Sequence, residues 1–462
     1  MRKRGEKIMI KRTVKQIAQM AGGTLSNQAF GEEQIYGVTT DTRKVSKGAL
    51  FIPLIGEHFN GHTFASKAVE LGAAAILWNQ KEANPPFGVP VILVDDTLTA
   101  LQQLAKSYLK EENPRVVGIT GSNGKTTTKD MIHSVLQTTY QVHKTDGNFN
   151  NHIGLPLTIL AMPEGTEIAV LEMGMSAKGE IEFLSNLAEP DAAVITNIGE
   201  SHMQDLGSRE AIADAKCEIT KGLKEDGTFY YLGDEPLIRE RATLLSQQVK
   251  TFGEAEDCDI KVTHINQLAE GTEFQVEGYA QGFLIPVLGK HNVKNALAAI
   301  AIGQHFGLNE RQIAQGLMQT KLTGMRLELF KTEKGITVIN DAYNASPTSM
   351  KAAIDLVGDM DGFANRILVL GDMLEMGSEE ETYHYELGRY IKPEFIDHVM
   401  TYGRLGAFIA EGAKKSFGDA RVFSFMDKEE LKKKLADVAG PDDVVLVKAS
   451  RGMRLEEVIT AL

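Results

Sequence analysis

The stretch that most constrains this chain is a glycine-rich loop at residues 118–128, with the sequence GITGSNGKTTT. The apolar run Arg115–Ile119 predicts a buried strand before it, and the pattern of Lys129–Leu136 predicts a helix after it. This is the layout of a phosphate-binding loop, in which backbone N–H groups and a helix N-terminus surround a phosphate. In such a loop Lys125 reaches the outer phosphates and the Thr126 hydroxyl binds Mg²⁺.

The loop departs from the usual G-x-x-x-x-G-K-[ST] pattern, because Ile119 stands where the first glycine belongs. The alternative interpretation is a glycine-rich turn that binds nothing. We expect nucleotide binding, because lysine and threonine follow the last glycine in the correct strand–helix context. The expected nucleotide contacts are Gly121, Ser122, Asn123, Gly124, Lys125, Thr126 and Thr127.

The composition limits the class of protein. A chain of 462 residues is long for one hydrophobic core and predicts two or three domains. Its 43% hydrophobic and 24% charged residues are typical of a soluble globular protein, and its apolar runs are far too short to cross a membrane. The net charge of −13 argues against a protein that coats nucleic acid, so an anionic substrate needs local lysine, arginine or metal.

Cysteine usage and the start of the chain indicate the compartment. Cys217 and Cys258 are the only cysteines and lack metal-type spacing, which excludes a disulfide framework and fits a reducing cytosol. Residues 1–9 are basic, but no long apolar segment follows them, so we expect a disordered start and no signal peptide. We therefore expect a cytoplasmic monomer with neither a nucleic-acid partner nor membrane insertion.

Alternating strand and helix patterns predict an α/β protein of three domains. Residues 1–112 predict a small α/β domain, whose first helix Thr13 and Gln16 cap, and the polar segment Glu111–Pro114 indicates a linker. Residues 113–326 predict a central parallel-sheet domain around the phosphate-binding loop, with antiparallel edge strands within residues 259–288. The expected parallel strands, apolar runs buried on both faces, include Glu167–Leu171, Ala192–Thr196 and Thr228–Leu232.

Residues 327–462 predict a C-terminal, Rossmann-like, doubly wound domain. Ser346-Pro347 indicates a helix start within it, with serine as the N-cap and proline at the first helical position. The expected strands are Ile336–Ile339, Ile367–Leu370, Val399–Tyr402 and Val444–Val447.

Polar residues follow several predicted strands, at the sheet edge where parallel sheets bind ligands. Glu172 ends one strand of the central domain and is a candidate Mg²⁺ ligand, and His202 follows the next strand along the chain. The alternatives are a solvated carboxylate and an ordinary surface or core histidine. Lys216, on a predicted helix, has the pattern of a surface lysine.

Further candidates lie after other strands and in one loop. Asn148 and Asn151 belong to a polar cluster that turn chemistry alone explains equally well. In the C-terminal domain polar residues end two predicted strands, and the cations among them can hold a carboxylate or phosphate. These residues are Asp341, Asn344, Lys448 and Arg451.

The motifs, taken in order, resemble the bacterial Mur ligases from about Val14 to Leu462. The stretches that carry the resemblance are GSNGKTT (121–127), GNFNNHIGLPLT (147–158), LEMG (171–174), TNIGESH (196–202), IADAK (212–216), HNVKN (291–295), GMR (324–326), DAYN (341–344), LGDMLE (370–375) and KASR (448–451). Two of them, at 341–345 and 370–373, resemble the branch that adds D-alanyl-D-alanine to UDP-N-acetylmuramoyl-tripeptide. The segment FIPLIGE (51–57) with Gly61-His62 resembles the UDP-sugar domain of that family.

The resemblance implies roles that spacing does not show. Lys216 matches a lysine that the family carbamylates into a metal ligand, which replaces the surface interpretation. The catalytic residues implied are Lys125, Glu172, His202 and Lys216, and two Mg²⁺ ions are implied, held by Thr126, Glu172, His202 and Lys216. The further ATP contacts implied are Asn295, Arg326, Asp341 and Asn344. Asp41, Thr42 and Arg43 match the region that binds UDP, and Asn148, Asn151, Lys448 and Arg451 complete the expected substrate-binding set.

The activity implied is carboxylate activation by ATP. The γ-phosphoryl group passes to the terminal carboxylate of the tripeptide, and the amine of D-alanyl-D-alanine attacks the acyl phosphate. Sites divided over three domains imply closure of the C-terminal domain. Two positions depart from the family pattern: Ser346 stands where asparagine is frequent, and Ala449 where glycine is frequent. Neither departure removes a charge.

Several alternatives remain open on the sequence alone. A sibling ligase with another amino-acid donor, or a folylpolyglutamate-synthase-like enzyme, would use the same chemistry. A P-loop ATPase that couples hydrolysis to movement and a non-catalytic nucleotide-binding scaffold are the other classes. Whether the tripeptide carries lysine or diaminopimelate also stays open.

Overall fold

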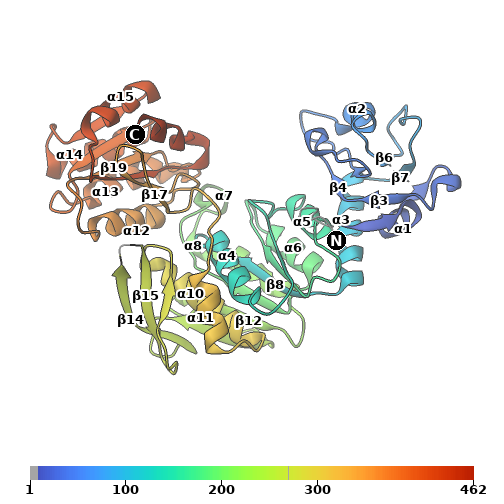
Figure 1. Ribbon diagram of the computed structural model, residues 1–462, viewed down its shortest axis with the longest axis horizontal. Coiled ribbons are helices and arrows are strands. Elements are labelled where there is room, and N and C mark those ends of the chain that lie inside the picture. The colour runs from blue at the N-terminus through green and yellow to red at the C-terminus, as the bar shows by residue number, and fades with distance from the viewer. Residues whose placement is uncertain (1–8, 269) are drawn as a thin grey trace.

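The structure is a computed structural model that describes residues 9–268 and 270–462. The expected disordered start therefore lies outside the described residues, except for Met9. Figure 1 shows three parts in chain order: a blue N-terminal part, a green-to-yellow central part and an orange-to-red C-terminal part. We call these parts domains, and their boundaries after residues 112 and 326 stay a prediction.

The N-terminal domain is built on a five-stranded sheet of order β2-β7-β6-β5-β4, which is parallel except for β2. The predicted capping box is confirmed: Gln16 N donates to Thr13 Oγ1 at 3.2 Å and Thr13 N to Gln16 Oε1 at 2.8 Å. The elements are β1 (Lys11–Thr13), α1 (Val14–Met20), β2 (Thr24–Leu25), β3 (Gln34–Tyr36), β4 (Val38–Thr39), β5 (Leu50–Phe51), α2 (Ala65–Glu70), β6 (Ala75–Asn79), β7 (Val91–Val94) and α3 (Thr97–Glu112).

The central domain carries a nine-stranded sheet of order β16-β15-β14-β13-β12-β11-β8-β10-β9. The pairs from β9 to β14 are parallel, and the predicted antiparallel edge is confirmed in β14–β15–β16. Its strands are β8 (Arg115–Thr120), β9 (Val142–Lys144), β10 (Ile168–Glu172), β11 (Ala192–Ile195), β12 (Thr228–Leu232), β13 (Gln248–Gly253), β14 (Ile260–Leu268), β15 (Gly271–Val276) and β16 (Phe283–Ile285). Its helices are α4 (Lys125–Leu136), α5 (Gly154–Leu160), α6 (Glu180–Ala188), α7 (Met203–Leu206), α8 (Arg209–Cys217), α9 (Pro236–Ala242), α10 (His291–His305) and α11 (Glu310–Met318).

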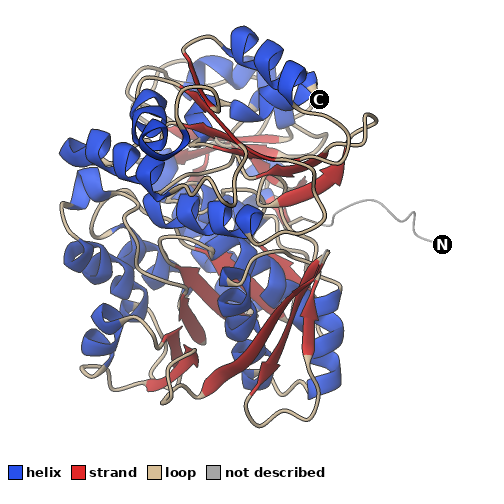
Figure 2. Cartoon of the chain, turned by 90° about the vertical axis from the view of Figure 1, so that its left-hand side faces the viewer, coloured by secondary structure: helices blue, strands red, loops and turns tan. Residues whose placement is uncertain are grey.

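The C-terminal domain has a six-stranded sheet of order β17-β18-β22-β19-β20-β21, parallel except for β17. Separate apolar clusters cover its two faces, one with α12, α13 and α14 and the other with α15, so the predicted doubly wound domain is confirmed. The elements are β17 (Glu328–Lys331), β18 (Thr337–Asn340), α12 (Pro347–Gly358), β19 (Arg366–Gly371), α13 (Glu380–Tyr390), β20 (His398–Tyr402), α14 (Gly406–Phe417), β21 (Val422–Phe425), α15 (Lys428–Val438) and β22 (Val444–Lys448). Figure 2 shows this sheet above the central sheet, with helices between the two.

The predicted linker at Glu111–Pro114 is wrong in part, because α3 continues through Glu112. The helix runs on since its apolar face is buried in one cluster shared by the N-terminal and central domains. Tyr108 is fully buried there, and its hydroxyl donates to the carbonyl oxygen of Met162 at 2.9 Å. The two domains thus share a core across the junction.

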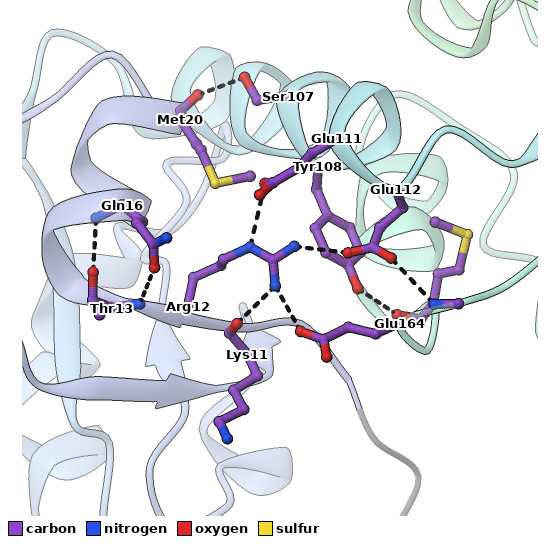
Figure 3. A network of polar contacts seen from close by, with 12 residues as sticks. Lys11, Arg12, Thr13, Gln16, Met20, Ser107, Tyr108, Glu111, Glu112 and Glu164 are labelled. Atoms are coloured by element: carbon purple, nitrogen blue, oxygen red, sulfur yellow. Dashed lines mark hydrogen bonds and ion pairs between the residues drawn. The ribbon is translucent and has the colours of Figure 1, made fainter.

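Arg12, on β1, fastens the same junction. Its guanidinium lies 2.7 Å from Glu112 and Glu164 and 3.3 Å from Glu111, and it stacks on the Tyr108 ring at 5.2 Å. Figure 3 shows β1, the end of α3 and the loop of Glu164 converging on this one side chain. Burial lowers the pKa of Arg12, but the hydrogen bonds to the carboxylates outweigh it and raise the pKa above its ordinary value. The cation therefore stays charged between the two domains.

No helix among the described residues combines the length and the apolarity needed to cross a membrane.

Candidate active site

A cavity of about 380 Å³ lies between the carboxyl edge of the central sheet and the C-terminal domain. Ligands of open parallel sheets bind at this edge, beyond the strand ends. Many of the residues predicted from the sequence meet here. Those that line it are Ser122, Asn123, Gly124, Lys125, Thr126, Thr127, Glu172, Asn295, Arg326, Asp341, Asn344 and Lys448.

The phosphate-binding loop uses its glycines differently from the usual pattern. Ile119 is fully buried inside β8, paired in register with Glu172, so no turn begins there. At Gly121, with φ of +147°, a Cβ atom would lie 1.9 Å from Thr196 Oγ1. At Gly124, with φ of +79°, a Cβ atom would lie 2.5 Å from Asn295 Oδ1. Both positions therefore require glycine, and α4 begins at the loop lysine rather than at Lys129 as predicted.

Lys125 folds back over its own loop. Its Nζ donates to the carbonyl oxygen of Gly121 at 2.7 Å. Burial lowers the pKa of Lys125, and the nearby Glu172 carboxylate opposes that shift. An ammonium group held against loop carbonyls is placed to turn outward to a phosphate when one enters.

Thr126 and Glu172 are directly joined. The Thr126 hydroxyl donates to Glu172 Oε2 at 2.9 Å, and Glu172 is 2% exposed at the end of β10. Asn150 Nδ2 donates to Glu172 Oε1 at 2.8 Å, and Lys129 Nζ lies 3.7 Å from Glu172 Oε2. A buried carboxylate beside a hydroxyl at a phosphate loop is a donor set that suits Mg²⁺.

Asn150 and Lys129 have no role predicted from the sequence. Asn150 belongs to an asparagine cluster that turn chemistry alone explains. The sequence does not single out Lys129, because the helical pattern after the phosphate loop does not show which buried carboxylate this lysine contacts. Other cavity-lining residues without a predicted role include His291, Asn292, Lys294 and Tyr343.

His202 and Lys216 lie outside the lining of this cavity. His202 caps α7 with a φ of +66°, and burial and the charges of Lys125 and Lys216 lower its pKa to about 4. Lys216, in the last turn of α8, is 1% exposed, so the surface interpretation of its pattern is wrong. Burial and then the charge of Lys125 lower the pKa of Lys216 well below its ordinary value.

The C-terminal domain contributes one wall of the cavity. Lys448 pairs with Asp341 and donates to the carbonyl oxygen of Asn344 at 3.0 Å, so the ends of β18 and β22 are joined at the site. Arg326, on the segment that enters this domain, stacks on the Tyr343 ring at 4.2 Å. The C-terminal side of the cavity therefore carries two cationic side chains, Lys448 and Arg326.

Six predicted substrate residues are not among those that line the cavity. Three of them, Asp41, Thr42 and Arg43, belong to the N-terminal domain. Asp41 is the N-cap of a short 3-10 turn and pairs with Arg43 at 2.8 Å. Asn148 is exposed in its loop, and Arg451 is half-exposed and pairs with Glu456. Asn151 Oδ1 accepts from Gly154 N, at the first residue of α5, at 2.8 Å.

The fold and the site define an ATP-dependent ligase class, and family models place the chain within it. The model for the Mur ligase middle domain matches residues 119–303. The model for the Mur ligase glutamate ligase domain matches residues 325–451, and that for the Mur ligase family catalytic domain matches residues 34–109. The chain belongs to the Mur ligase family.

Two relatives that match nearly the whole chain share one name. The UDP-N-acetylmuramoyl-tripeptide--D-alanyl-D-alanine ligase of Bacillus subtilis (strain 168) is 61% identical over 98% of this chain and 99% of its own. The protein of that name from Haemophilus influenzae is 36% identical over 98% and 99%. Crystal structure I of MurF from Acinetobacter baumannii has a TM-score of 0.88 at 29% identity and covers 98% of this chain and 99% of its own. The structure of MurF ligase from Thermotoga maritima in complex with ADP has a TM-score of 0.81 at 30% identity, over 92% and 96%.

The departure at Ser346 has a local explanation. Ser346 is the N-cap of α12, its hydroxyl accepts from Ser349 N at 3.4 Å, and Pro347 occupies the first helical position as predicted. Serine and asparagine both cap helices by accepting such a bond, so either residue serves here. Ala449 is fully buried against the C-terminal core.

Proposed function

We propose that this chain is the ATP-dependent ligase that joins D-alanyl-D-alanine to UDP-N-acetylmuramoyl-tripeptide. The observation that carries the proposal is the cavity where the loop of Lys125, the Thr126–Glu172 pair and the C-terminal Lys448–Asp341 pair face one another. Phosphoryl transfer to a carboxylate followed by amine attack needs such positioning of charge from two sides. The 61% identity to the Bacillus subtilis ligase over nearly the full chain supports the choice of substrates.

Each step has a residue to perform it. Backbone N–H groups of residues 121–127 would hold the phosphates, and Lys125 would turn from Gly121 to the γ-phosphate as charge moves toward the acceptor carboxylate. The acyl phosphate that results has a good leaving group, so the dipeptide amine displaces phosphate to form the amide. Asn295 and Arg326 would contact the nucleotide, and the cations Lys448 and Arg451 would hold the dipeptide carboxylate.

The donor set fits Mg²⁺ beside the phosphates. Among the described residues no group of three or more His, Cys, Asp or Glu side chains suits a metal. Mg²⁺ takes one or two protein ligands together with phosphate oxygens and waters, and Thr126 with Glu172 supplies those two. A second ion would use His202 and Lys216. When bound, the ions neutralise the charge of the transferring phosphoryl group.

Lys216 suits the carbamate that the family resemblance implies. Formation of a carbamate requires a neutral amine and CO₂, and burial favours the neutral amine of Lys216 by lowering its pKa. The modified side chain would carry a carboxylate-like group in place of the cation. Such a group is an oxygen ligand of the kind Mg²⁺ prefers.

The UDP moiety would bind at the N-terminal domain, at Asp41, Thr42 and Arg43, and the tripeptide would extend past Asn148 and Asn151. Lys44 supports this path, because its ammonium lies 5.1 Å from the Phe149 ring and joins the two segments. A monomer in the cytoplasm is proposed with it, since ATP and a UDP-linked precursor are cytoplasmic compounds.

The test is phosphate release with ATP and Mg²⁺, with the two substrates added singly and together. The expected result is release only with both, with a product heavier by the dipeptide in mass spectrometry. Substituting L-alanyl-L-alanine is the matched control, and comparing the lysine with the diaminopimelate tripeptide fixes the third residue. Phosphate release with neither substrate would overturn the proposal in favour of a simple ATPase.

A further inference from the structure

The loop that carries His202 is held by the C-terminal domain at two points. Thr348, in the first turn of α12, donates from its hydroxyl to Glu200 Oε2 at 2.7 Å. Glu375, in the loop after β19, places Oε2 3.2 Å from His202 Nδ1. Its backbone carbonyl also accepts from Gln204 N at 3.4 Å. Two different elements of the C-terminal domain, α12 and the loop after β19, therefore contact the segment from Glu200 to Gln204.

The loop that presents Glu375 is itself fixed. Met373 N donates to His384 Nε2 at 2.8 Å, and Leu374 N donates to Ser450 Oγ at 2.9 Å. These partners belong to α13 and to the segment after β22. The Glu375 carboxylate is therefore carried to His202 by a rigid part of the C-terminal domain, and it arrives only when that domain is docked.

The chemistry of the contact selects one form of the imidazole. A neutral histidine has one N–H donor and one acceptor nitrogen, whereas an ionised carboxylate only accepts. A carboxylate beside Nδ1 therefore favours the proton on Nδ1 and leaves the lone pair of Nε2 free for a ligand. Within the described residues Nδ1 has no well-aligned hydrogen bond, although Glu375 Oε2 lies 3.2 Å from it on a side chain that is 61% exposed.

We propose that Glu375 is a positioning residue that fixes the tautomer and the orientation of His202 from across the domain boundary. The Thr348–Glu200 hydrogen bond holds the other end of the same loop. Docking of the C-terminal domain thereby completes the γ-phosphate side of the site, in addition to bringing the dipeptide. This inference deepens the proposed function and rests on the role given there to His202.

The test compares three variants of the full-length protein. Glu375→Met removes the acceptor, and Glu375→Gln keeps one through its amide oxygen. Glu379→Met is the matched control, because Glu379 is exposed and its side chain has no hydrogen bond or ion pair among the described residues. Long-range ¹H–¹⁵N spectra of the histidine rings at neutral pH report the tautomer, and His202→Asn assigns the His202 signals.

The expected result is an Nδ1–H tautomer of His202 in the wild type, in Glu375→Gln and in the control, with a mixture of tautomers in Glu375→Met. In the ligase assay Glu375→Met should lower kcat by about tenfold, as loss of a carboxylate behind a ligating histidine does, with KM for the UDP substrate within about twofold. An unchanged tautomer in Glu375→Met would overturn the inference. If the wild type forms no ligated product while the tautomers behave as expected, the proposed function fails and the positioning role stands.

Discussion

Asp130, fully buried on α4, accepts hydrogen bonds from both the backbone N–H and the hydroxyl of Thr323, at 2.8 and 2.9 Å. The two residues are 193 positions apart. Thr323 belongs to the segment that leads into the C-terminal domain, and Arg326 of the nucleotide cavity follows it. The helix of the phosphate-binding loop thus anchors the segment that leads into the C-terminal domain.

Substitution of Asp130 should lower the free energy of unfolding strongly. Asp130→Asn leaves Lys144, which lies 2.6 Å from Asp130 Oδ1, without its buried counter-charge. We expect the free energy of unfolding to fall by about 3 kcal/mol, as for a broken buried ion pair. Thr323→Val, which removes one hydrogen bond, should lower it by about 1 kcal/mol. Urea titration measures both, and equal effects of the two variants would contradict the assignment.

The Thr126–Glu172 pair predicts a defect in chemistry rather than in folding. Thr126→Val removes a hydroxyl from the proposed Mg²⁺ site and should lower kcat by about 100-fold, which corresponds to about 2.7 kcal/mol of lost transition-state stabilisation. The matched control is Thr138→Val, which alters a threonine beyond the end of α4. Phosphate release at saturating Mg²⁺ and the melting temperature should be measured for both. Wild-type kcat in Thr126→Val would exclude the site.

Lys216 predicts a reversible modification. In ¹³C-bicarbonate at pH 8 the wild type should show a carbamate carbon signal that disappears on acidification, because a protonated carbamate breaks its N–C bond and leaves CO₂ and the amine. Lys216→Ala should lack this signal and ligase activity, and added bicarbonate should not rescue it. Lys221→Ala, an exposed lysine in the next turn, is the control. Full ligase activity in Lys216→Ala would contradict the carbamate.

His133 predicts a pH dependence of stability. Burial, and then the charge of Lys144, lower the pKa of His133 to about 4 from its ordinary 6.5. The unfolded chain therefore binds more protons between these values, so the free energy of unfolding is highest above pH 6.5 and falls as the pH drops toward 4. At about 1.4 kcal/mol per pKa unit, reduced for partial exposure, the loss should be about 1–2 kcal/mol. Urea titrations at pH 7 and pH 4.5 measure the free energy of unfolding of the wild type and of His133→Phe. The loss between the two pH values should be larger in the wild type by this amount, and equal losses in both proteins would contradict the prediction.

Replacing Arg12 should lower the free energy of unfolding even when the new residue is lysine. Arg12→Lys keeps the charge but cannot meet Glu111, Glu112 and Glu164 with one planar fork, nor stack on Tyr108. We expect a loss of about 2–3 kcal/mol in the free energy of unfolding for both Arg12→Lys and Arg12→Met. Denaturant titration checks this, and a wild-type value for Arg12→Lys would show that charge alone is sufficient.

Local signals predicted much of this architecture. The capping residues Thr13 and Ser346 marked helix starts, and the apolar runs marked the central strands, because these signals lie in consecutive residues. The P-loop lysine and Glu172 were found for the same reason, since strand ends point to the ligand edge. Burial of Lys216 was missed from spacing alone and entered only through the resemblance. Contacts such as Asp130–Thr323 join residues remote in sequence, so only the folded chain reveals them.

The shared helix α3 also constrains how the chain can be made. Its residues Leu101, Leu104 and Tyr108 are buried together with Leu155 and Ile159 of α5. During synthesis, residues 9–112 leave the ribosome well before α5 does. The apolar face of α3 therefore stays exposed until α5 has been made. The first quarter of this protein is therefore not an independent folding unit, and a fragment cut after Glu112 should aggregate rather than bind a nucleotide sugar.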